Sequence, residues 1–120
     1  MTEASITRAG DVASEDYPWG RLDWFVSKAL GNSRKLTVGR CQIDPGQANA
    51  PHYHPNCDEV LHVLRGRIRH RLGDEYVEMA EGDTISIPTG EVHNAENIGN
   101  DRAVLLITFS TADRQVVTVD

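Results

Sequence analysis

Turn-forming residues recur about every ten positions along most of this chain, and they limit the length of every segment between them. Runs of such residues include 44–46, 73–74, 81–83, 88–90 and 99–101. The intervening segments are short and rich in β-branched and aliphatic residues, as in 35–43, 59–64, 84–87 and 103–109. Many short strands at this spacing predict an all-β sandwich or barrel. The 120 residues are enough for one such domain.

The charge balance argues against nucleic acid and anionic membranes as partners. The formal net charge is −6, whereas both partners usually require a basic surface. The chain has no apolar run of the roughly 18 to 20 residues that cross a bilayer, and residues 1–16 lack the apolar core of a signal peptide. Two cysteines, Cys41 and Cys57, are too few for a disulfide framework. We therefore expect a cytoplasmic protein with free thiols.

The chain divides into a short N-terminal arm and one domain. Residues 1–16 are rich in small and acidic types without periodicity, so we expect a flexible arm followed by a single domain over residues 17–120. Residues 21–30 fit two descriptions. Their apolar positions have helical spacing, but the aromatic and β-branched run at 24–26 favours a strand, which is the assignment we prefer.

Alternation separates the faces of the expected strands. In residues 67–72, Ile68, His70 and Leu72 share one face, and the arginines occupy the other, which we expect to face solvent. Residues 59–64 and 103–109 are instead apolar on both faces, so both faces need cover. In so small a domain the second cover is expected to come from another chain, which predicts a homodimer.

Three histidines and one glutamate have the spacing of metal ligands. In the extended segment 51–55, His52 and His54 project from the same face, about 6 to 7 Å apart at the backbone, so both imidazoles can reach one ion. Glu59 opens the next strand, and His93 follows a Pro-x-Gly turn. Taken singly, Glu59 and His93 fit a solvated carboxylate and a surface histidine. Together they suit Fe, Mn, Ni, Zn or Cu better than Ca or Mg.

The glycines and prolines around these residues resemble the two motifs of the cupin superfamily. The first motif, G-x(5)-H-x-H-x(3,4)-E-x(6)-G, is matched by Gly46, His52, His54, Glu59 and Gly66. The second, G-x(5)-P-x-G-x(2)-H-x(3)-N, is matched by Gly82, Pro88, Gly90, His93 and Asn97. The resemblance implies an antiparallel jelly-roll β-barrel with one divalent transition metal in its mouth. It also implies that the glycines occupy tight bends and that Asn97 has a structural role.

The resemblance further implies a metal-dependent enzyme that acts on a small molecule. The activity we expect first is an oxygenase acting on a carboxylate- or carbonyl-bearing metabolite, ahead of isomerase, cyclase, decarboxylase or lyase chemistry. This order rests on what proteins of this fold commonly do. The alternative is a non-catalytic metal-containing module that binds a small ligand without converting it.

Further residues near the expected site are weaker candidates. Glu59 and His70 are the candidate catalytic residues, because a weakly bound carboxylate can act as a base and His70 faces the expected lumen. For His70, a buried hydrogen-bonded histidine is the alternative. We expect Cys57 to be an inert loop thiol rather than a redox-sensitive one. Trp19 and Trp24 are expected to anchor the core or an interface rather than contact substrate.

Overall fold

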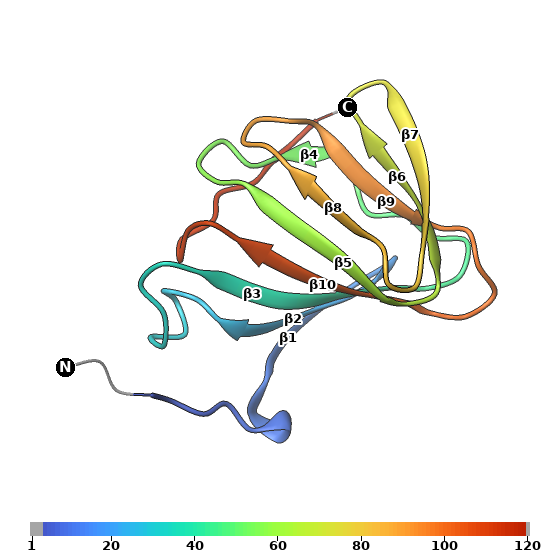
Figure 1. Cartoon of the computed structure of the whole chain (residues 1–120). Helices are drawn as coiled ribbons and strands as arrows, with labels where there is room; N and C mark the ends of the chain where they lie inside the picture. Colours follow the sequence, from blue (N-terminus) through green and yellow to red (C-terminus); the bar gives the residue numbers. More distant parts are fainter. Residues whose placement is uncertain (1–3, 120) are drawn as a thin grey trace.

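The computed structural model describes residues 4–119 and consists of two antiparallel sheets that face each other (Figure 1). The six-stranded sheet has the order β1 (Ala13–Tyr17), β2 (Gly20–Val26), β3 (Thr37–Ile43), β10 (Ala103–Phe109), β5 (Glu59–Arg65) and β8 (Thr84–Ile87). The five-stranded sheet has the order β11 (Val117–Thr118), β4 (His52–Tyr53), β9 (His93–Asn97), β6 (Arg67–Leu72) and β7 (Glu75–Ala80). The predicted all-β jelly-roll fold is confirmed. In the described part of the chain the helical structure is one 3-10 turn, η1 (Ala9–Asp11), and no helix is long and apolar enough to cross a membrane.

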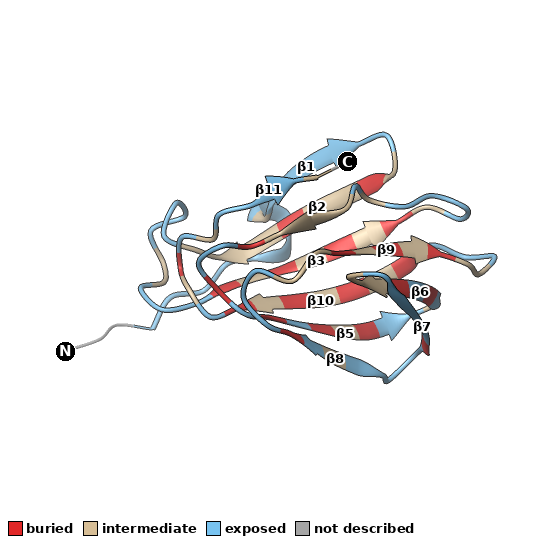
Figure 2. Cartoon of the chain, turned by 90° about the horizontal axis from the view of Figure 1, so that it is seen from above, coloured by how far each residue is buried: buried red, intermediate tan, exposed pale blue. Residues whose placement is uncertain are grey.

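Strand β10 shows why these residues form the core. Its residues alternate between fully and partly buried positions, and it pairs with β3 on one side and β5 on the other. Leu105, Ile107 and Phe109 point into the space between the sheets, and each buried side chain of this size stabilises the fold by about 1.5 to 3 kcal/mol. Figure 2 shows the same alternation of buried and more exposed positions along β3 and β10.

The motif glycines and Asn97 have the predicted structural roles. Gly66, Gly82 and Gly90 have φ values of 92°, 92° and 84°, in the region that disfavours other residues. At Gly66 a Cβ would also lie 3.1 Å from the Cα of Ala103, where the β5–β6 turn passes β10. The buried amide of Asn97 donates hydrogen bonds to the carbonyls of Ile43 and Asp101, at 2.8 Å each. Asn97 thereby ties β9 to the end of β3.

The N-terminal part of the chain differs from the expected arm. Strand β1 begins at Ala13, ahead of the boundary expected at residue 17, and pairs with β2 along its whole length. Every residue of β1 is exposed, so the strand carries no hydrophobic alternation that the sequence could reveal. Residues 1–3 of the expected arm lie outside the described part of the chain. The strand preferred for residues 21–30 is confirmed over Gly20–Val26, whereas residues 28–30 form a turn.

The faces of the strands follow the predicted alternation. In β6, Ile68 and His70 are buried, whereas Arg67 and Arg69 lie outside and pair with carboxylates on β7 and β9. The outer face of the six-stranded sheet is apolar along β5, where the Leu64 side chain is 44% exposed and Val60 is similarly open. Residues 4–119 leave Val60 and Leu64 exposed on this face, and the dimer predicted from it stays a prediction.

Candidate metal centre and pocket

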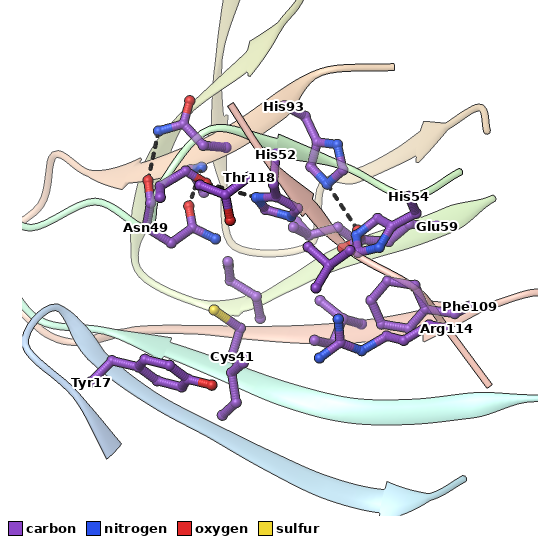
Figure 3. A pocket seen from close by; sticks show the side chains of 18 of the residues that line it. Tyr17, Cys41, Asn49, His52, His54, Glu59, His93, Phe109, Arg114 and Thr118 are labelled. Carbon is purple, nitrogen blue, oxygen red and sulfur yellow. Dashed lines mark hydrogen bonds and ion pairs between the residues drawn. The ribbon is translucent and has the colours of Figure 1, made fainter. Parts of the chain in front are cut away.

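Four of the residues singled out in the sequence come together between the two sheets. His52 and His54 come from β4 and the turn after it, Glu59 begins β5, and His93 begins β9. The β4–β9 pairing sets His52 directly opposite His93, with ring centres 4.3 Å apart. One possible ligand atom from each of the four residues lies within 4.8 Å of the other three (Figure 3). These residues form the candidate metal centre.

Backbone carbonyls fix the orientation of all three histidine rings. In each ring Nδ1 lies 2.7 to 2.9 Å from a main-chain oxygen. The carbonyls belong to Ala50 for His52, Gln115 for His54 and Glu91 for His93. A carbonyl can only accept a hydrogen bond, so Nδ1 carries the proton and the lone pair of a neutral ring is on Nε2. This is how proteins commonly orient histidines that bind a metal.

Glu59 provides a buried negative charge at the centre of the group. Its Oε1 lies 3.0 Å from His93 Nε2 and 3.2 Å from His54 Nε2 (Figure 3). Burial alone would raise the pKa of Glu59, but its contacts with His54 and His93 lower it well below its usual range. Burial likewise tends to lower the pKa of His93, yet the hydrogen bond and charge of Glu59 outweigh it and raise that pKa.

The donor set fits a divalent transition metal. His54 Nε2 is buried and has no hydrogen-bond partner among residues 4–119. An unpaired buried nitrogen is costly, and a cation bound by the lone pair would remove that cost. Burial, followed by the charge of His93, lowers the pKa of His52 to about 4, so that its ring is neutral and able to bind at pH 7. Three imidazoles and one carboxylate leave open coordination positions on an ion that prefers six ligands.

His70 lies beside this centre and differs from the hydrogen-bonded histidine considered from the sequence. Its side chain is completely buried, but neither ring nitrogen has a partner within the described chain. The ring stacks on His93 with an interplanar angle of 15° and a centre-to-centre distance of 5.7 Å. Burial, followed by the charge of His93, lowers the pKa of His70 to about 4. His70 is therefore a neutral imidazole with a free donor and a free acceptor, at the wall of the pocket.

The candidate metal centre opens into a cavity of about 320 Å³ with largely apolar walls. Trp19 and Trp24 line this cavity as well as packing against the core, so they are pocket residues in addition to the core anchors expected from the sequence. Cys41 also lines it, and burial raises the pKa of its thiol. Cys57 is buried outside the lining, and burial raises its thiol pKa too, as suits an inert residue. Both cysteines are free.

Arg114 is a pocket residue that the sequence analysis did not identify. It lies in the connection between β10 and β11 and extends past the Phe109 ring into the cavity (Figure 3). The segment has no motif, and a single arginine in a polar stretch is indistinguishable from a surface residue. Arg114 reaches the cavity only because this connection folds back across the two sheets, so its place in the pocket could not be predicted from the sequence.

The chain belongs to the cupin family, because residues 39–109 match the cupin domain. Germin-like protein 3-5 of Oryza sativa subsp. japonica is 30% identical over 128 residues, covering 99% of this chain and 56% of that protein. Tetracenomycin polyketide synthase protein TcmJ of Streptomyces glaucescens is 29% identical over 73 residues, covering 61% of this chain and 49% of TcmJ. This chain therefore spans about half the length of these two relatives.

Two solved structures show the same fold. The formate complex of Lactobacillus farciminis oxalate decarboxylase superimposes with a TM-score of 0.85 at 19% identity, over 92% of this chain and 34% of that one. Bacillus subtilis oxalate decarboxylase, which has Mn(II) centres, superimposes with a TM-score of 0.80 at 22% identity, over 87% of this chain and 29% of that one. At these identities the likeness establishes the fold alone.

Proposed function

We propose that this protein is a metal-dependent enzyme that acts on a small carboxylate- or carbonyl-bearing molecule, with oxygenase activity the first to be tested. The observation that carries the proposal is the arrangement of the three histidines. Each donates its Nδ1 proton to a backbone carbonyl, and the Nε2 atoms of His54 and His93 converge on the buried carboxylate of Glu59. Placing these groups together away from water is costly unless a cation binds among them.

Residues around the centre support catalysis as well as binding. A divalent transition metal held by His52, His54, Glu59 and His93 would supply Lewis acidity or redox chemistry to a ligand in the cavity. His70 is neutral, lies at the cavity wall and has no hydrogen-bond partner among residues 4–119, so it is able to accept a proton from such a ligand or donate a hydrogen bond to it. The apolar walls exclude water, which strengthens every polar interaction inside.

Turnover with a reconstituted metal tests this function. The metal-free protein is loaded separately with Mn, Fe, Ni, Cu or Zn, Mn being the first choice because Bacillus subtilis oxalate decarboxylase has Mn(II) centres. Oxygen uptake and substrate loss are then followed with a library of small 2-oxo, hydroxy and aromatic acids. Metal-dependent turnover that is lost in His70→Gln without loss of metal would support the enzyme. Stoichiometric metal with ligand binding but no turnover of any acid would favour the non-catalytic binding module.

A further inference from the structure

Arg114 is a charged side chain at the wall of the cavity, and it has no ionic partner among the residues that the structure describes. Among the described residues that line the cavity, Glu59 and Arg114 are the two whose side chains carry a full charge at neutral pH, histidines aside. The charge of Glu59 is engaged by His54 and His93. Arg114 forms neither an ion pair nor a side-chain hydrogen bond with any residue from 4 to 119, so its guanidinium N–H groups are available to a ligand.

Two aromatic rings hold this guanidinium in place. It lies over the Trp24 ring, 4.3 Å from the ring centre, and 5.2 Å from the centre of Phe109. The indole of Trp24 is itself fixed, because its Nε1 donates a 2.8 Å hydrogen bond to Glu15 and its six-membered ring lies close to Gly39. A stacked, half-buried guanidinium is preorganised for two parallel hydrogen bonds, which is the geometry that a carboxylate accepts.

The same Phe109 ring connects Arg114 to the candidate metal centre. The ring centre of Phe109 is 4.9 Å from that of His54 and 5.2 Å from the guanidinium carbon of Arg114. The two groups are therefore at most about 10 Å apart, a span that one small organic acid can bridge. Figure 3 shows the guanidinium below the histidines, facing the same open space.

The rest of the cavity has room for an apolar body. A volume of about 320 Å³ is at the lower end of the roughly 300 to 1,000 Å³ found for small-molecule pockets. Between the two charged ends the walls consist largely of hydrophobic side chains, among them Trp19, Leu22, Leu61, Leu105 and Ile107. A two-carbon diacid would leave most of this apolar surface in contact with water, whereas an aromatic or branched body would cover it.

We propose that the cavity binds an aromatic or branched aliphatic monocarboxylate, with the carboxylate on Arg114, the apolar body on the tryptophan side and a further oxygen directed to the candidate metal centre. Arg114 is then the residue that selects for the acid. Because it takes this cavity to be the substrate site of the proposed enzyme, the assignment rests on the proposed function. A purely structural Arg114, which only fastens residues 110–116 to Trp24, would give no preference between an acid and its uncharged analogue.

Calorimetric titration with a matched pair of probes tests the assignment without turnover. 3-Phenylpropionate, its uncharged amide and propionate are titrated into the metal-depleted and the Mn-loaded protein. We expect the wild type to bind the phenyl acid at least about tenfold more tightly than the amide, since a charged hydrogen-bond pair is lost. The wild type should also bind the phenyl acid at least about tenfold more tightly than propionate, which lacks the ring.

Variants at Arg114 separate recognition from folding. Arg114→Gln should bind the phenyl acid and the amide equally, and Arg114→Lys should recover part of the preference. The control Arg102→Gln removes a surface arginine that pairs with Asp44 at 2.9 Å, and it should behave as the wild type. Equal binding of acid and amide by the wild type, retention of the preference in Arg114→Gln, or no binding of the phenyl acid would each overturn the assignment.

The two states of the protein keep this test distinct from that of the proposed function. A preference for the acid in the metal-depleted protein, combined with failure to retain any metal, would support the acid site and contradict the metal enzyme. Metal-dependent turnover without any preference for the acid would support the metal enzyme and contradict the acid site.

Discussion

Replacing His70 by leucine is predicted to stabilise the metal-free protein. The imidazole is fully buried on β6, and neither ring nitrogen has a partner among residues 4–119. A neutral imidazole carries one N–H, and a buried donor without an acceptor costs about 1 to 3 kcal/mol. Leucine removes this polar group from a face that it would share with Ile68. After allowance for imperfect packing, His70→Leu should raise the free energy of unfolding at pH 7 by about 1 kcal/mol.

The same substitution is predicted to reduce sensitivity to acid. The folded-state pKa of His70 is about 4, because of burial and then the charge of His93, whereas the unfolded value is about 6.5. As the pH falls below 6.5 the unfolded chain binds the proton first, so the folded state loses stability until about pH 4. At about 1.4 kcal/mol per pKa unit, this loss amounts to about 3 kcal/mol. Leucine does not titrate, so the advantage of the variant should grow by about that amount.

Urea unfolding followed by tryptophan fluorescence measures both effects. Chelator-treated wild type and His70→Leu are compared at about pH 7, 5.5 and 4, at constant ionic strength. The control is His62→Gln on the outer face of β5, where the Nδ1 atom contacts the Thr84 hydroxyl and solvent reaches the side chain. A His70→Leu protein that is less stable than the wild type, with the same dependence on pH, would refute the description of His70 as a buried, unpaired histidine.

Three further predictions concern other parts of the molecule. Gly39→Ala should destabilise the fold by about 1 to 3 kcal/mol in urea unfolding and shift the tryptophan emission, because the new Cβ would lie 2.5 Å from Trp24 Cε3; unchanged stability would contradict this contact. Because Glu59 outweighs burial and raises the pKa of His93 above its usual value of about 6.5, metal affinity in competition titrations should already be falling at that pH and should approach a tenfold loss per unit below it. A constant affinity down to pH 6 would contradict the assigned ligand. Light scattering should give twice the chain mass of 13.3 kDa for the wild type and the monomer mass for Leu64→Glu, which places a charge on the exposed apolar face. A wild-type monomer at micromolar concentration would refute the predicted dimer.

The four residues of the candidate centre were predictable because local spacing places them. His52 and His54 alternate on one short extended segment, Glu59 begins the next strand, and Gly90 turns the chain so that His93 pairs with His52. Each step depends on the geometry of strands and turns, which acts over a few residues. The tight bends and the structural role of Asn97 were expected only from the resemblance to the cupin motifs, because Asn97 bonds the distant carbonyl of Ile43.

The features that the sequence analysis did not predict depend on packing between distant segments. Arg114 enters the cavity only because the connection after β10 folds across both sheets, and Trp24 supports it only because Gly39 leaves room on the neighbouring strand. The alternation around His70 predicted its inward face, but its lack of hydrogen-bond partners within the described chain depends on neighbours from β9 and β7. Strand β1 was not predicted because it is exposed along its whole length and therefore carries no hydrophobic pattern.

The central claim is that this chain binds one transition metal through its three convergent histidines and Glu59. Elemental analysis of the untagged protein after reconstitution and desalting tests it, alongside His54→Ala and the outer-face control His62→Ala. We predict about one metal ion per chain in the wild type and the control, and loss of most of it in His54→Ala, whose wild-type Nε2 is buried without a hydrogen-bond partner in the described chain. Near-stoichiometric metal in a folded His54→Ala protein, or none in the wild type, would contradict the claim.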